Sequence, residues 1–232
     1  MARELDGIHF MMPTPFTEQY KIDEECIARL VTLAANAGCR GVVCLGVMGE
    51  HTRLTEAERQ QVVRLVTQEA RGRLTVTVGA TAQGNDLAVE HVLEAQARGA
   101  NAVMVAPPTL RKPNLDSVFA YYKAINDATA IPIVVQDFPE ENGVFMPAPF
   151  IARLYTEMER VRYLKLEDPP TPPKVTQVRK AAGDDLGIFG GLGGSFLLEE
   201  LLRGACGTMT GFAYPEVLVQ VHQHVMAGQE DA

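Results

Sequence analysis

The feature that most constrains the fold is a short apolar segment followed by a helical one, repeated along the chain. Near-continuous apolar runs are typical of parallel strands whose outer face is covered by helices. Eight such repeats within 232 residues predict a (β/α)8 TIM barrel, formed by one domain that spans residues 1–232. The predicted strands are Ile8–Met12, Gly41–Leu45, Leu74–Gly79, Ala102–Ala106, Ile131–Gln136, Arg162–Leu166, Gly187–Phe189 and Gly207–Thr210.

Helix signals lie between these strands. Asp23 can cap the first helix, and Thr55 with Glu58 forms a capping box at the start of the second. Later helices are expected at residues 85–98, 116–125, 147–158, 173–182, 196–203 and 215–227. The alternative fold, an open doubly wound sheet, usually has a dinucleotide fingerprint, but no GxGxxG follows the first strand here.

The composition argues against several classes of partner. The net charge of −8 and the absence of a basic run argue against nucleic acid and against anionic membrane surfaces. No apolar stretch approaches the roughly 18 residues of a membrane span, and Met1–Phe16 does not have the pattern of a secretory signal. The four cysteines occur singly, without metal-ligand spacing. We therefore expect a cytoplasmic protein with no metal site.

Lys165 is the first candidate catalytic residue. It lies in the predicted sixth strand, where burying an ammonium group without a partner is costly. Barrel enzymes place their active sites at the carboxyl ends of the strands, and an amine there could form a Schiff base with a ketone or an aldehyde. The alternative is a lysine whose charged end simply reaches solvent. Glu167 shares the face of Lys165, because strand side chains alternate, and could move a proton or only pair with the lysine.

The ends of other predicted strands supply further candidates. Backbone N–H groups in the loop 46–50 could bind a carboxylate, or the loop could be a plain tight turn. We expect Glu50 to be buried and hydrogen-bonded, so that it holds the loop. Gln136 can donate and accept hydrogen bonds, whereas Asp137 could contact substrate or cap the turn. The glycines of 190–195 could approach an anion or only leave room for substrate. The predicted substrate-binding residues are Gly46, Val47, Met48, Gly49, Glu50, Thr109, Asp137, Gly191 and Thr210.

The order of these motifs resembles that of the dihydrodipicolinate synthase / N-acetylneuraminate lyase family of class I aldolases. The matching landmarks are Pro13–Phe16, Gly46–Arg59, Pro132–Val144 and Lys165, which together extend over nearly the whole chain. The resemblance implies that Lys165 forms a Schiff base with a 2-keto acid such as pyruvate, with Val47 and Met48 in the loop that binds its carboxylate. It also implies that no organic cofactor or metal is needed and that the protein is a homo-oligomer, a dimer or a tetramer.

Several positions depart from the synthase pattern. Val47 and Met48 stand where the synthase has two threonines, and Gln136 stands where it has a tyrosine. Glu141 replaces the arginine that holds the carboxylate of the synthase's aldehyde substrate, and the segment 106–109 has no tyrosine pair. The hydroxyl relay of the synthase is therefore missing.

A closer likeness is to the L-2-keto-3-deoxyarabonate dehydratase subgroup, which removes water from a 2-keto-3-deoxy sugar acid through the same lysine. It rests on residues 135–139, 148–153, 165–167 and 204–211, although the subgroup varies the loop at 46–50. We expect a lyase, either a sugar-acid dehydratase or an aldolase, in which Glu167 carries the proton and Gln136 positions a substrate hydroxyl. The alternatives are the synthase itself and a ligand-binding barrel with little turnover. The family's helical extension after the eighth helix is expected to be missing, since the sequence ends at residue 232.

Overall fold

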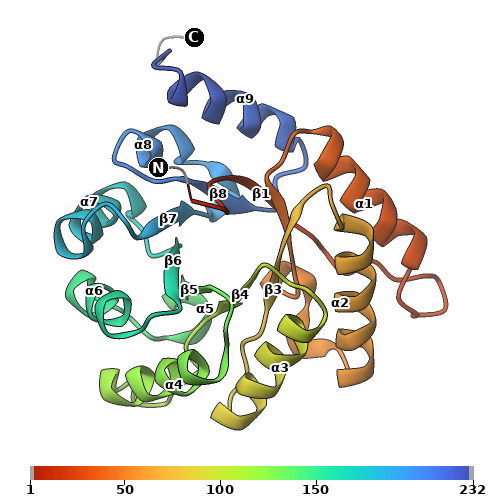
Figure 1. Cartoon of the computed structure of the whole chain (residues 1–232), viewed down its shortest axis with the longest axis horizontal. Coiled ribbons are helices and arrows are strands. Elements are labelled where there is room, and N and C mark those ends of the chain that lie inside the picture. The colour runs from red at the N-terminus through yellow and green to blue at the C-terminus, as the bar shows by residue number, and fades with distance from the viewer. Residues whose placement is uncertain (1–2, 230–232) are drawn as a thin grey trace.

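The computed structural model describes residues 3–229 and is a closed barrel of eight parallel strands (Figure 1). Each strand pairs with the next along the chain, and β1 also pairs with β8 to close the barrel. The (β/α)8 TIM barrel is therefore confirmed; of the predicted domain 1–232, residues 1–2 and 230–232 lie outside the described residues. The strands are β1 (Gly7–Met11), β2 (Gly41–Cys44), β3 (Thr75–Gly79), β4 (Ala102–Val105), β5 (Ile133–Asp137), β6 (Val161–Leu166), β7 (Gly187–Gly190) and β8 (Gly207–Thr210).

Helices surround the barrel and connect its strands (Figure 1). Three 3-10 turns, η1 (Val47–Gly49), η2 (His51–Arg53) and η3 (Leu192–Gly194), follow β2 and β7. Within residues 3–229, no helix combines the length and the apolar character needed to cross a membrane. The α-helices are α1 (Glu24–Asn36), α2 (Glu56–Ala70), α3 (Asn85–Ala97), α4 (Leu115–Ala128), α5 (Pro139–Asn142), α6 (Ala148–Glu157), α7 (Thr171–Ala182), α8 (Leu197–Leu201) and α9 (Pro215–Met226).

Side-chain caps fix where several helices begin. Asp23 accepts a hydrogen bond from the Cys26 N–H at the start of α1, and Thr55 forms both halves of the capping box of α2. Asn114 caps α4, so this helix begins one residue before the predicted Asp116. The helix α7 begins at Thr171, two residues earlier than predicted, because proline is tolerated in a first helical turn.

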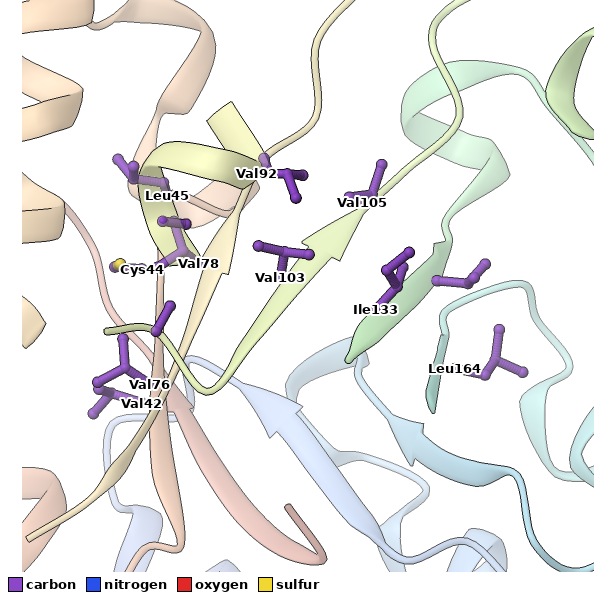
Figure 2. Close-up of a cluster of buried hydrophobic side chains, with 14 of the residues drawn as sticks. Val42, Cys44, Leu45, Val76, Val78, Val92, Val103, Val105, Ile133 and Leu164 are labelled. Atoms are coloured by element: carbon purple, nitrogen blue, oxygen red, sulfur yellow. The ribbon is translucent and has the colours of Figure 1, made fainter. Parts of the chain in front are cut away.

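The core has two layers on opposite faces of the strands. The larger layer lies between the strands and the helices, and Figure 2 shows Val42, Val76, Val103 and Ile133 contributing to it from four successive strands. The smaller layer fills the barrel interior, with residues such as Met104, Val134 and Phe189. Since side chains alternate between these layers, every second residue near a strand's carboxyl end points toward the barrel axis.

Candidate active site

Lys165 lies inside the barrel at the carboxyl end of β6, next to Gln136 of β5 in the strand register. It is 2% exposed. Its Nζ is 2.9 Å from Oε1 of Glu167 and 3.0 Å from Sδ of Met11. Burying an ammonium group without a partner is so costly that a lone lysine would lose its charge. The Glu167 carboxylate compensates much of this cost. The lysine is therefore not one that extends to solvent.

Glu167 connects the three predicted catalytic residues. Its Oε1 faces Lys165, and its Oε2 accepts a 2.8 Å hydrogen bond from Nε2 of Gln136. The neighbouring Gly191 leaves the room that this carboxylate occupies, because a Cβ at position 191 would lie 2.6 Å from Cγ of Glu167. Lys165, Glu167 and Gln136 thus form one buried hydrogen-bonded group, with Gly191 beside it.

A cavity of about 280 Å³ opens onto this group. The walls around the amine are largely apolar and include Met11, Met48 and Met209. Thr210, the predicted residue from β8, also lines this cavity. An apolar wall excludes water from the amine and strengthens electrostatic interactions within the cavity.

The loop after β2 has the geometry of an anion-binding turn. Val47 and Met48 line the cavity and begin η1, so their N–H groups have no partner within the turn. Thr14 holds the turn in place, because its hydroxyl donates a 2.7 Å hydrogen bond to the carbonyl of Gly49. Gly46 is buried against Met11, whose Cε would lie 2.4 Å from a Cβ at this position. The two N–H groups belong to residues that line the Lys165 cavity, which makes this turn the candidate site for a carboxylate.

The expectation that Glu50 is buried and holds this loop is wrong. Its side chain is 46% exposed and pairs with Arg53 at 3.1 Å. Glu50 has a left-handed backbone conformation, with φ of 53°, which turns its side chain outward from the end of η1. The loop is held by Thr14 and by its own backbone hydrogen bonds instead.

Asp137 does not reach the cavity, so its predicted substrate contact is not supported by its position. It follows Gln136 on β5 and therefore points to the opposite face, toward α7. Its Oδ2 lies 2.6 Å from Nζ of Lys174, which also pairs with Asp168 at 2.6 Å. Burial raises the pKa of Asp137 to about 6, although the ammonium of Lys174 acts in the opposite direction. Asp137 joins β5 to α7 and does not cap the turn.

A second cavity lies beside the first and shares Val47, Gln136 and Phe138 with it. The predicted residue Thr109 lines this second cavity, together with His51 and Glu141. Burial lowers the pKa of His51 to about 4, with the nearby Arg59 acting in the same direction, so its imidazole is neutral at pH 7.

Sequence reasoning missed Asn142, which also lines the second cavity. Its Oδ1 accepts a 2.8 Å hydrogen bond from the Val144 N–H. Its Nδ2 is buried and has no hydrogen-bond partner within the described part of the chain. The only signal in the sequence is its position in the loop after β5, directly before Gly143. The direction of its side chain could not be read from that.

Comparisons with known proteins agree with this architecture. Residues 4–232 match the profile of the dihydrodipicolinate synthetase family. An L-2-keto-3-deoxyarabonate dehydratase of Azospirillum brasilense is 33% identical over 97% of this chain and 74% of the dehydratase. A 4-hydroxy-tetrahydrodipicolinate synthase of Chloroherpeton thalassium is 30% identical over 82% of this chain, which spans 62% of that synthase.

Solved structures give the same result. The dihydrodipicolinate synthase from Rhodopseudomonas palustris superimposes with a TM-score of 0.91 at 33% identity, over 98% of this chain and 77% of that one. YagE, a prophage protein from E. coli K12 in complex with pyruvate, has a TM-score of 0.91 over 97% of this chain and 77% of its own, but only 21% identity, so it shares the fold alone. With the match over residues 4–232, the chain belongs to the dihydrodipicolinate synthetase family.

Proposed function

We propose that the protein is a lyase that forms a Schiff base between Lys165 and the C2 ketone of a 2-keto acid, with 2-keto-3-deoxy sugar acids as its substrates. The observation that carries the proposal is the buried Lys165 beside Glu167, at the base of a cavity that opens at the barrel mouth. The 33% identity to an L-2-keto-3-deoxyarabonate dehydratase over 97% of the chain supports this choice of substrate.

In the first step, Glu167 accepts a proton from the lysine, and the free amine attacks C2 of the keto acid. The protonated Glu167 then returns its proton to the former ketone oxygen, which leaves as water, so that an iminium ion and the Glu167 carboxylate remain. The substrate carboxylate lies against the N–H groups of Val47 and Met48. The 2.9 Å separation of Nζ and Oε1 suits a direct proton transfer.

The iminium ion then acts as an electron sink. It makes the C3 protons acidic, and a carboxylate beside the nitrogen can remove one of them. The resulting enamine can expel a hydroxyl from C4, which leaves as water once it is protonated. In the aldolase variant, the carboxylate instead removes the proton of the C4 hydroxyl from the iminium form. The C3–C4 bond then breaks, its electrons form the enamine, and the fragment that carries C4 leaves as an aldehyde. Gln136 holds the other oxygen of Glu167, so the carboxylate stays oriented through both steps.

The proposal is tested by reduction with borohydride in the presence of pyruvate, followed by intact mass measurement. We expect a single covalent adduct in the wild-type protein and none in Lys165→Ala. The exposed Lys123 provides the control, because it lines neither of the two cavities, and Lys123→Ala should keep the adduct. An adduct that persists in Lys165→Ala with the wild-type yield contradicts the proposal.

A second candidate is the synthase activity named for the Chloroherpeton relative. Against it, Glu141 lines the second cavity and would repel a carboxylate on the aldehyde substrate. The two activities are separated by assaying the protein with a panel of 2-keto-3-deoxy sugar acids and with pyruvate plus the synthase's aldehyde. Keto-acid binding without product in either assay would favour a ligand-binding barrel.

A further inference from the structure

We propose that Lys174 is a positioning residue for the Schiff-base chemistry. Its ammonium joins the ends of β5 and β6 on the outside of the barrel, and it thereby holds Glu167 in place on the inside. Lys174 lines neither of the two cavities described above, so it acts through Glu167 and does not touch the substrate. This inference rests on the proposed function, because the group that Lys174 positions is the proton carrier of that reaction.

Lys174 bridges two carboxylates that belong to different strand ends. Its Nζ is 2.6 Å from Oδ2 of Asp137, the last residue of β5, and 2.6 Å from Oδ2 of Asp168, two residues after the end of β6. Asp137 is fully buried, and its other oxygen has no hydrogen-bond partner within residues 3–229. The lysine is therefore the counter-charge that allows this carboxylate to be buried.

The position of Lys174 in α7 shows that it does not serve the helix alone. It is the fourth residue of α7, where a cation opposes the helix dipole. Its side chain is only 11% exposed, whereas lysines are almost never buried unless they are paired. The two carboxylates offset both costs, so the strand ends explain why a lysine lies here.

The residues that precede the two aspartates meet inside the barrel. Gln136 comes directly before Asp137 in the sequence, and Glu167 comes directly before Asp168. Nε2 of Gln136 donates the 2.8 Å hydrogen bond to Oε2 of Glu167 described above. The N–H of Glu167 also donates a 2.8 Å hydrogen bond to the carbonyl of Asp137, so the backbones of the two strand ends are joined. A displacement of either aspartate therefore moves one partner of the Gln136–Glu167 contact.

The inner and outer groups also interact electrostatically. Burial is the main cause of the raised pKa of Asp137, and the charges of Asp168 and Glu167 act in the same direction. The charge of Lys174 acts against all three. Without this ammonium, three carboxylates would lie close together at the ends of two neighbouring strands, and their repulsion would push the strand ends apart.

The proposed proton transfer is sensitive to such a displacement. A proton passes between Nζ of Lys165 and Glu167 only over a short contact, about 2.6–3.2 Å between heavy atoms, and the two atoms are 2.9 Å apart. A misplacement of about 1 Å can lower a rate on the order of 10²-fold. Loss of the bridge should therefore slow the reaction even where the fold is kept.

Three substitutions test the bridge in different ways. Asp168→Ala removes one half of it and leaves the buried pair of Lys174 and Asp137 intact, so this variant should fold even if Lys174→Met does not. Lys174→Met removes the charge but keeps a long, flexible side chain. Lys174→Arg keeps the charge, and its larger guanidinium has room in the groove of about 680 Å³ that Lys174 lines. The control, Asp127→Asn, breaks an exposed ion pair on α4.

The measured quantity is the rate of pyruvate trapping, at borohydride concentrations that no longer limit it. We expect this rate to fall at least 10-fold in Lys174→Met and at least 3-fold in Asp168→Ala. It should stay within 3-fold of wild type in Lys174→Arg and unchanged in Asp127→Asn. The pyruvate concentration for half-maximal trapping should change less than 3-fold, because the carboxylate turn after β2 belongs to another element. Wild-type trapping in a folded Asp168→Ala or Lys174→Met overturns the inference.

Combination with Glu167→Gln separates positioning from general damage to the fold. If Lys174 acts through Glu167, Lys174→Met should change the trapping rate less than 2-fold once Glu167 is replaced. Asp168→Ala takes its place in this comparison if Lys174→Met does not fold. Equal relative losses in both backgrounds overturn the inference, because they indicate a purely structural role. If the wild-type protein traps no pyruvate, the proposed function fails and this inference fails with it, whereas normal trapping in the variants leaves the proposed function intact.

Discussion

At the residue scale, the proposed chemistry depends on the carboxylate of Glu167, whose two oxygens contact different residues. Glu167 contacts both Lys165 and Gln136, and Gly191 leaves the space in which it does so. An amide in place of this carboxylate would keep the shape but could neither take a proton from the lysine nor neutralise it. The family likeness points to the lysine, and the arrangement around it supports the proposal that Glu167 carries the proton where the synthase has a tyrosine.

We therefore predict that Glu167→Gln lowers kcat about 10²- to 10⁴-fold, the usual contribution of a positioned acid–base group. It should also reduce the free energy of unfolding by about 3 kcal/mol, because a buried lysine loses its counter-charge. Steady-state kinetics and urea denaturation measure the two effects. Glu157→Gln, on the exposed end of α6, is the control and should change neither quantity appreciably. Wild-type kcat in Glu167→Gln would show that another group carries the proton.

At the element scale, another buried carboxyl, that of Glu200, joins β7, α7 and α8. Glu200 of α8 is 2% exposed, and its Oε1 accepts a hydrogen bond from the hydroxyl of Thr171, the first residue of α7. Gly190 makes room for it, since a Cβ there would lie 1.8 Å from Oε2 of Glu200. Burial raises the pKa of Glu200 to about 7, so the folded state prefers the protonated carboxyl.

This carboxyl predicts a specific dependence of stability on pH. Because the pKa is higher in the folded state than its ordinary value of 4.5, its contribution is fully present below about pH 4.5 and is lost as the pH rises through 7. Glu200→Gln is neutral at every pH and removes that loss. Between pH 4.5 and 8, the free energy of unfolding, measured in urea, should fall by on the order of 2 kcal/mol more in the wild type than in the variant. Parallel pH curves for the two proteins would contradict the assignment.

The same elements show what a sequence can predict. The strands were located within two residues, because buried parallel strands are continuous apolar runs of recognisable length. The helix α5 was missed, since four residues are too few for a helical period. Lys165 and Glu167 were placed together correctly by the alternation of a strand. For Gln136 and Asp137, alternation says that they face opposite sides but not which side each takes. Asn142 required the loop geometry itself.

At the scale of the whole molecule, the site exists only in a closed barrel. Met11 reaches the lysine from β1, Gln136 from β5 and Thr210 from β8, so distant parts of the chain meet at one cavity. Neither an open sheet nor a partial barrel would bring them together. The pairing of β1 with β8 therefore brings Met11 and Thr210 to the cavity that holds Lys165.

Gly207 tests the importance of that closure. It is paired with Gly7 across the seam between β8 and β1, and its φ of +153° is one that other residues rarely adopt. A Cβ at Gly207 would lie 1.8 Å from the carbonyl oxygen of Gly7, a backbone atom that cannot move without opening the seam. We predict that Gly207→Ala lowers the free energy of unfolding by about 4 kcal/mol or more, measured in urea, or prevents soluble expression.

The matched control is Gly99→Ala. Gly99 also has a positive φ, +88°, but a Cβ there meets nothing within 4 Å, so the substitution introduces backbone strain without a clash. It should cost about 1–2 kcal/mol and leave pyruvate trapping at Lys165 intact. Equal free energies of unfolding for the two variants would mean that the β8–β1 pairing accommodates an added methyl group. In that case the site would tolerate a barrel that closes less tightly. A much larger loss of unfolding free energy in Gly207→Ala, together with loss of pyruvate trapping, would show that the reactivity of Lys165 depends on the pairing of β8 with β1.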